Sequence, residues 1–171
     1  MLKCGDRLLV KKIKGWKLIP EIICWWTDSK YSHIEPIYRE NGDSVDASFP
    51  KLIESNIGKY FDGMHRVMLI RPVVAFDDVK WRTNLADCIG KGYDLLSYLG
   101  FVFNKNIQDK AKYNCSELVL LLDRSACILR DYDSYIRPES YYDFAIAGMF
   151  EIVFQKDFAD MNDFNKLRED K

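Results

Sequence analysis

The sequence predicts one domain of the α+β class. Short β-prone segments and segments with helical periodicity follow one another in a mixed order along the chain. A strong turn signal at residues 40–43 favours antiparallel pairing between two of the β-prone segments. No linker or repeat divides residues 1–156, so we expect them to form a single domain, followed by a charged and loose tail at residues 157–171.

Five segments are predicted to be strands, because they are rich in β-branched and aromatic residues and are bounded by turn residues. They are residues 7–10, 31–38, 44–48, 66–74 and 150–154. Pro36 lies in the second segment and has no backbone N–H, so we expect that strand at a sheet edge or with a bulge. Residues 51–60 are predicted to be a polar connection with some helical character.

Five segments are predicted to be helices from their apolar spacing and their capping residues. They are residues 19–27, 78–89, 95–103, 115–123 and a short helix that begins at residues 137–140. Aspartates cap the second of these helices, and its apolar face is expected to consist of Trp81, Leu85, Cys88 and Ile89.

The composition excludes several classes of protein. Of the 171 residues, 25 are basic and 26 are acidic, and this balance argues against a general nucleic-acid-binding role. The five cysteines form no CxxC pair, so we expect neither a disulfide framework nor a zinc site, and a reducing compartment fits best. We see no apolar run of membrane-spanning length and no apolar signal at the N-terminus, so we expect a cytoplasmic protein.

One cysteine lies where a helix is expected to begin. In residues 113–119 (YNCSELV), Asn114 is predicted to be the N-cap and Glu117 to complete a capping box. Cys115 would then be the first helical residue, where the positive end of the helix dipole favours a thiolate over a thiol. The alternative is that Cys115 is a small apolar residue of the core, as buried free cysteines often are.

A cysteine nucleophile requires a base, and His33 is the candidate. It begins the β-prone segment that leads into the hairpin turn, whereas His65 lies in a turn beside Arg66 and is expected at the surface. The second nitrogen of His33 needs an acceptor that orients the ring. Two carboxylates compete for this role, Asp46 on the neighbouring strand and Glu35 on the strand of His33 itself.

The simplest hairpin does not bring Asp46 to His33. A two-residue turn at residues 41–42 pairs Asp46 with Ile37, which leaves Asp46 about four residues, or roughly 13 Å, from His33 along the strand. A longer loop or a bulge would shorten this separation. Glu35 shares a face with His33 by strand alternation, but a lone carboxylate on an edge strand is usually solvated, so both assignments stay open.

Two adjacent tryptophans, Trp25 and Trp26, lie on the predicted helix at residues 19–27. A helix that faces the core accounts for them directly. The alternative is that they form one wall of an apolar substrate groove, because tryptophans often line such sites.

The order of these features resembles the circularly permuted NlpC/P60 group of papain-like cysteine hydrolases, in its YiiX-like branch. In ordinary NlpC/P60 enzymes the cysteine helix precedes the histidine hairpin, whereas in the permuted group the hairpin comes first, as it does here. The resemblance covers about residues 4–154 and rests on Gly5-Asp6, Ser32-His33-Ile34, Val45-Asp46-Ala47, Tyr93-Asp94, Tyr113 to Val119 and Arg137-Pro138.

The resemblance implies a role for each matched residue. Cys115 matches the nucleophile, His33 the base, and Asp46 the third polar position, which in this branch is more often glutamate. Tyr113 matches a tyrosine that lines the site and helps to hold the oxyanion, and the Cys115 N–H would be the other donor. Glu35 stands where the family usually has a small residue, and Pro36 follows it.

Together, the residues and the resemblance predict a cysteine hydrolase of the amidase, peptidase or acyl-transfer type. Its expected substrate is a peptide, or an N-acyl or lipid-like amide or ester, bound near Tyr93, Trp25 and Trp26, and the expected chemistry needs no cofactor and no metal. Two alternatives stay open: a non-catalytic binding module on the same fold, and a structural or interaction protein whose Cys115 lies in the core.

Overall fold

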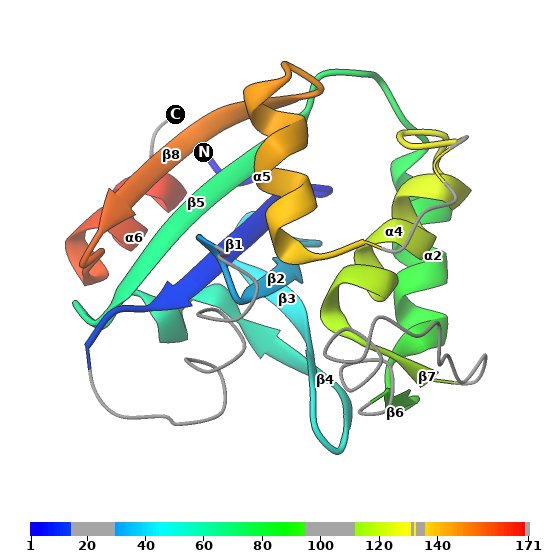
Figure 1. Ribbon diagram of the computed structural model, residues 1–171, viewed down its shortest axis with the longest axis horizontal. Coiled ribbons are helices and arrows are strands. Elements are labelled where there is room, and N and C mark those ends of the chain that lie inside the picture. Colours follow the sequence, from blue (N-terminus) through cyan, green and yellow to red (C-terminus); the bar gives the residue numbers. More distant parts are fainter. Residues whose placement is uncertain (15–29, 95–111, 131, 133–135, 170–171) are drawn as a thin grey trace.

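The computed structural model in Figure 1 describes residues 1–14, 30–94, 112–130, 132 and 136–169. The helices predicted at residues 19–27 and 95–103, with Trp25 and Trp26, lie outside the described residues. The described part contains two four-stranded sheets together with helices, so the predicted α+β class is confirmed. None of its helices is long and apolar enough to cross a lipid bilayer.

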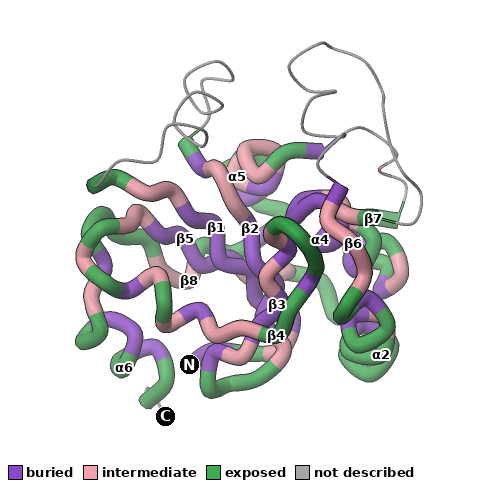
Figure 2. The backbone as a smooth tube through the Cα atoms, turned by 90° about the horizontal axis from the view of Figure 1, so that it is seen from below, coloured by how far each residue is buried: buried purple, intermediate pink, exposed green. Residues whose placement is uncertain are grey.

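The first sheet is antiparallel, with the strand order β2-β1-β5-β8. Its strands are β1 (Arg7–Lys12), β2 (His33–Pro36), β5 (His65–Pro72) and β8 (Phe150–Asp157). Successive residues of a strand face opposite sides of its sheet. Leu9 and Met68 accordingly join one buried cluster, whereas Leu8 and Val67 join a second cluster. Figure 2 shows buried backbone running through β1, β2 and β5, which explains the unbroken apolar run at the start of β1.

The second sheet has the strand order β3-β4-β6-β7. Its strands are β3 (Asp43–Ser48), β4 (Lys51–Asn56), β6 (Gly92–Tyr93) and β7 (Lys112–Tyr113), and β6 and β7 are parallel. A short 3₁₀ helix, η1 (Ile57–Tyr60), follows β4. The prediction of a polar connection at residues 51–60 is therefore wrong for β4. Leu52 is its one buried residue, so the sequence lacks the apolar alternation that marks a strand.

The α-helices of the described residues are α2 (Asp78–Cys88), α4 (Cys115–Ser125), α5 (Pro138–Ile146) and α6 (Met161–Glu169). Residues of α2, α4 and α5 join the buried cluster of Leu9 and Met68. α5 lies in front of the first sheet, α4 packs against β2, and α2 packs against α4 (Figure 1). The starts of these three helices agree with the prediction, because residues typical of a helix N-terminus stand there in the sequence. Ile89 is a correction: it lies beyond the end of α2 and is 38% exposed.

The C-terminal residues are not the loose tail that we expected from their charge. β8 extends to Asp157, and α6 packs on the opposite face of the first sheet from α5. Phe164 and Leu167 are buried there, and Lys156 forms an ion pair with Asp163. Met161, Phe164 and Leu167 recur every third residue and make α6 amphipathic, but its many charged residues conceal this in the composition.

Phe164 also supports the turn that follows β2. A Cβ atom added at Gly42 would come within 2.9 Å of the Phe164 ring, and one added at Gly58 within 3.0 Å. Gly42 has a φ of +92°, a conformation that other residues rarely adopt. The last helix therefore packs directly against the β2–β3 turn and the start of η1.

A buried ion pair ties α4 to the first sheet. The Arg7 guanidinium donates to the carboxylate of Asp123 and to the carbonyl of Gly5, and both charged side chains are fully buried. The Tyr141 hydroxyl donates to the other Asp123 oxygen at 2.9 Å. Because Asp123 lies near the C-terminal end of α4, this network fixes the helix that begins at Cys115.

Candidate active site

The first turn of α4 is held by its N-cap. The Asn114 side-chain oxygen accepts the N–H groups of Ser116 and Glu117, each at 2.9 Å, and the Glu117 carboxylate accepts the Asn114 N–H at 3.0 Å. This is the predicted capping box. The Leu118 N–H bonds to the Asn114 carbonyl. Among the described residues, the N–H of Cys115 has no hydrogen-bond acceptor.

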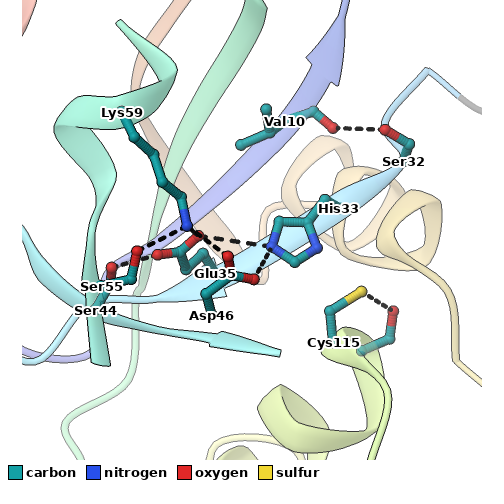
Figure 3. A network of polar contacts seen from close by, with 10 residues as sticks. Val10, Ser32, His33, Glu35, Ser44, Asp46, Ser55, Lys59 and Cys115 are labelled. Carbon is teal, nitrogen blue, oxygen red and sulfur yellow. Dashed lines mark hydrogen bonds and ion pairs between the residues drawn. The ribbon is translucent and has the colours of Figure 1, made fainter. Parts of the chain in front are cut away.

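Cys115 begins α4 and faces the imidazole of His33 on β2, as Figure 3 shows. β2 is an edge strand, as predicted, so its outer side is open to a helix. The Ile34 N–H on that strand interacts with the Cys115 sulfur. Cys115 is 1% exposed, and the His33 side chain is 19% exposed.

Two carboxylates reach the same nitrogen of His33. Its Nε2 lies 3.3 Å from Oδ1 of Asp46 and 3.6 Å from Oε2 of Glu35. Neither contact is aligned as a straight hydrogen bond, which is consistent with one N–H group placed between two acceptors. The opposite edge of the ring is turned toward Cys115 (Figure 3). The structure thus brings Cys115, His33, Asp46 and Glu35 into one cluster.

The contact between Asp46 and His33 depends on how β2 and β3 separate. The loop between them is longer than a two-residue turn, because the Tyr38 N–H bonds to the Asp43 carbonyl. An isolated antiparallel bridge between Ile37 and Ser44 joins the two segments. Beyond this bridge, β2 pairs within the first sheet and β3 pairs within the second. In this register Asp46 lies opposite Glu35, and the roughly 13 Å separation expected from the shorter turn does not arise.

The carboxylates are held by residues that the sequence did not single out. The Lys59 ammonium lies 2.6 Å from Oδ2 of Asp46 and 3.1 Å from Oε2 of Glu35, and it donates to the Ser55 hydroxyl at 2.7 Å. The Ser44 hydroxyl donates to the other Glu35 oxygen. Lys59 lies in η1, within the stretch predicted to be a connection, and no local pattern indicates that its side chain points inward.

Tyr60, also in η1, covers the ring of His33. Their ring centroids are 6.1 Å apart, and the Tyr60 ring also makes an edge-on contact with His65, with 5.5 Å between centroids. Burial, together with the charges of Glu35 and Asp46, raises the pKa of Tyr60 far above its usual value, so its hydroxyl stays protonated. His65 pairs with Asp62 at 2.8 Å and is not part of the cluster.

The electrostatics favour a thiolate–imidazolium pair. Burial alone would raise the pKa of Cys115, but the charge and hydrogen bond of His33 outweigh it and the pKa is lowered. Burial alone would lower the pKa of His33, but the charge of Cys115 and the contacts with Asp46 and Glu35 raise it well above its usual value. The pKa of Glu35 and that of Asp46 are both lowered despite burial, chiefly by His33, so both remain ionised.

The same cluster has the make-up of a metal site. The donor atoms of His33, Glu35 and Asp46 lie within 4.8 Å of one another, and zinc accepts such ligands. Lys59, however, places its ammonium against both carboxylates. A divalent cation between them would sit close to that ammonium and be repelled by it. We therefore assign no metal here.

The two predicted tyrosines lie beside the start of α4. Tyr93 and Tyr113 are paired residues of β6 and β7, and both are half-buried. Tyr113 is two residues before Cys115, and the Lys91 ammonium lies over its ring, 5.4 Å from the centroid. Tyr113 is thus close to the candidate nucleophile in the chain, and Tyr93 is next to Tyr113 through strand pairing, whereas Trp25 and Trp26 lie outside the described residues.

No protein-family model matches this chain, and no curated protein matches it with significant similarity.

Proposed function

We propose that this protein is a cysteine hydrolase, of the amidase, peptidase or acyl-transfer type, on a permuted papain-like fold. The observation that carries the proposal is the placement of Cys115 at the start of a capped helix, facing a His33 ring whose Nε2 lies 3.3 Å from Asp46. A nucleophile, a base and an orienting acceptor in this arrangement are the general requirement for activating a thiol.

The proposed reaction starts from the ion pair. The Cys115 thiolate attacks the carbonyl carbon of an amide or ester, and the carbonyl π electrons move to the oxygen. The Cys115 N–H stabilises this oxyanion, because it is the helix N–H left without an acceptor among the described residues. His33 then transfers its proton to the departing amine or alcohol as that bond breaks, which leaves a thioester on Cys115.

The second half of the reaction returns the enzyme to its starting state. His33, now neutral, takes a proton from water, or from an acceptor alcohol or amine, as that group attacks the thioester. The acyl group leaves as an acid, ester or amide, and the proton remains on His33. Asp46 keeps Nε2 protonated throughout, so the nitrogen that faces Cys115 exchanges the proton.

We propose peptides and N-acyl or lipid-like amides or esters as substrates, with no cofactor, metal or nucleic acid involved. Cys4, Cys88, Cys115 and Cys127 are free thiols. Free thiols, one of them a nucleophile, persist best in a reducing compartment, and we propose the cytoplasm.

One observation favours the alternative of a structural or interaction protein, in which Cys115 is a core residue. Its exposed fraction is 1%, and it belongs to the buried cluster of Leu9 and Met68. Core cysteines, however, do not normally face a histidine, whereas Cys115 faces His33, whose far nitrogen lies beside two carboxylates.

Cys88 provides a matched control for deciding between these functions. It is buried to the same extent as Cys115, at 1% exposed, but burial raises its pKa. We expect iodoacetamide near neutral pH to alkylate Cys115 well before Cys88, and we expect Cys115→Ala to abolish turnover of activated acyl esters and amides. Equal labelling of the two thiols, or full turnover by Cys115→Ala, would refute the proposal.

A further inference from the structure

Four charged side chains form a closed ring beside the candidate nucleophile. Nε2 of His33 lies 3.3 Å from Asp46, Asp46 lies 2.6 Å from Lys59, Lys59 lies 3.1 Å from Glu35, and Glu35 lies 3.6 Å from Nε2 of His33. Positive and negative groups therefore alternate around the ring when His33 is protonated (Figure 3). In that state the ring carries two positive and two negative charges.

The groups that face His33 come from several elements. They are Glu35 of β2, Asp46 of β3, Lys59 and Tyr60 of η1, and Cys115 of α4, and His65 of β5 contacts the Tyr60 ring. Of the groups in direct contact with its ring or its carboxylates, Lys59 is the cation. Without the charge of Lys59, the His33 imidazolium would be the one positive charge facing two carboxylates and a thiolate.

Lys59 is held in place by the local fold. The Asn56 side chain accepts the Gly58 N–H at 2.9 Å and so starts η1 directly after β4. The Ser55 hydroxyl and the Tyr60 ring, 4.7 Å from the ammonium, fix the lysine side chain. The ammonium is thus built into the site, although about a third of the side chain remains exposed, at 35%.

We propose that Lys59 is a positioning residue of this site: its ammonium holds Glu35 and Asp46 together on Nε2 of His33 and determines how readily the His33 imidazolium releases its proton. This inference rests on the proposed function, because a proton that moves between Cys115 and His33 is what the reaction needs. Too many negative charges on one imidazolium would make it a poor acid toward the leaving group. Lys59 offsets one of them.

The test is the titration of His33, which needs no substrate. The chain contains two histidines, so ring nitrogen NMR signals are assigned with one His65→Asn variant. In a Cys115→Ala background, Lys59→Met should move the His33 titration midpoint upward by roughly one to three pH units, since removal of a nearby positive charge stabilises the imidazolium. Lys59→Arg keeps the charge and should restore the midpoint to near its starting value.

Lys156 is the matched control, because it makes a comparable ion pair, 2.8 Å from Asp163, outside this ring. Lys156→Met should leave the His33 midpoint unchanged. With Cys115 present, Lys59→Met should also move the alkylation profile of Cys115 to higher pH. Circular dichroism and thermal melts establish that each variant is folded.

Three outcomes would overturn the proposal: an unchanged His33 midpoint in folded Lys59→Met, an equal shift in folded Lys59→Arg, or His33 signals that move when zinc is added to the unmodified chain. The last would mean that the ring binds a metal in place of the ammonium. None of these outcomes depends on turnover, so failure of the Lys59 proposal can be distinguished from failure of the hydrolase proposal. If only the hydrolase proposal fails, Lys59→Met still shifts the His33 titration, but the protein consumes no acyl substrate.

Discussion

Oδ1 of Asp46 lies 3.3 Å from Nε2 of His33, although the two residues belong to strands of different sheets. Glu35 approaches the same nitrogen at 3.6 Å from within the strand of His33. The two acceptors differ in their other contacts. The Glu35 oxygen that approaches His33, Oε2, also contacts Lys59. Asp46 uses one oxygen, Oδ1, for His33 and the other, Oδ2, for Lys59. We infer that Asp46 is the main orienting group.

Asp46→Asn should therefore lower kcat/KM strongly, by up to about 10⁴-fold, because the imidazole loses the acceptor that fixes its tautomer. Glu35→Gln is the matched variant and should have a much smaller effect. Both are assayed on the same acyl substrate, with thermal melts to verify folding. If Glu35→Gln is the impaired enzyme, the orienting acceptor lies on β2. If neither variant is impaired, the site functions as a Cys115–His33 dyad.

The alkylation of Cys115 should depend on pH in a way that reveals the ion pair. The lowered pKa of Cys115 means that the thiolate forms below the pH of about 8.5 at which a free cysteine ionises. The raised pKa of His33 means that the imidazolium persists above about pH 6.5. The pair therefore exists between the two macroscopic pKa values, and the iodoacetamide rate should rise well below pH 8.5. His33→Asn should return the midpoint to the free-cysteine range, and a wild-type midpoint near 8.5 would show that no ion pair forms.

The N-cap of α4 should contribute to the stability of the fold. Asn114→Ala leaves the N–H groups of Ser116 and Glu117 without their acceptor and should cost about 1 kcal/mol of unfolding free energy. Asn114→Ser keeps a capping oxygen and should recover most of that loss. Urea denaturation measures the stability. An Asn114→Ala protein as stable as Asn114→Ser would contradict the role of the cap.

The buried Arg7–Asp123 pair should be much more important for stability than the exposed pairs. Asp123→Leu strands a fully buried guanidinium and should cost about 3–5 kcal/mol. The double variant Arg7→Met with Asp123→Leu removes both charges and should be less destabilised than the single variant. Thermal melts measure the stability of the single and the double variant. A double variant that is less stable than Asp123→Leu alone would contradict the expectation.

Phe164→Ala should impair both the fold and the site. Phe164 is 4% exposed, and its loss should cost about 3–5 kcal/mol. Because its ring supports Gly42 and Gly58, the variant should also lower kcat/KM under conditions in which it stays folded. Phe158→Ala is the control, since Phe158 is 42% exposed and should change little. A folded Phe164→Ala enzyme with normal kinetics would show that α6 does not support the site.

The sequence was most informative where the structure is local. The cap of Cys115 depends on Asn114 and Glu117, which lie within three residues, so the helix start and its cysteine follow from the chain alone. The position of Asp46 depends on the length of the loop between β2 and β3 and on the separation of these two strands. Strand propensity predicts neither of these. Lys59 and Tyr60 follow a strand with one buried residue, so their stretch resembled a connection. Phe164 was hidden in a charged segment.

The site combines two parts that the chain keeps far apart. Among the described residues, the carboxylates beside His33 and the ammonium that holds them come from Glu35, Asp46 and Lys59, whereas the candidate nucleophile is Cys115. The two parts meet by packing the start of α4 against the outer side of β2, and this contact does not depend on which part is synthesised first. A chain cut within one surface connection and rejoined at its termini would therefore preserve the same chemistry, and the order of nucleophile and base along a polypeptide is free to change without rebuilding the site.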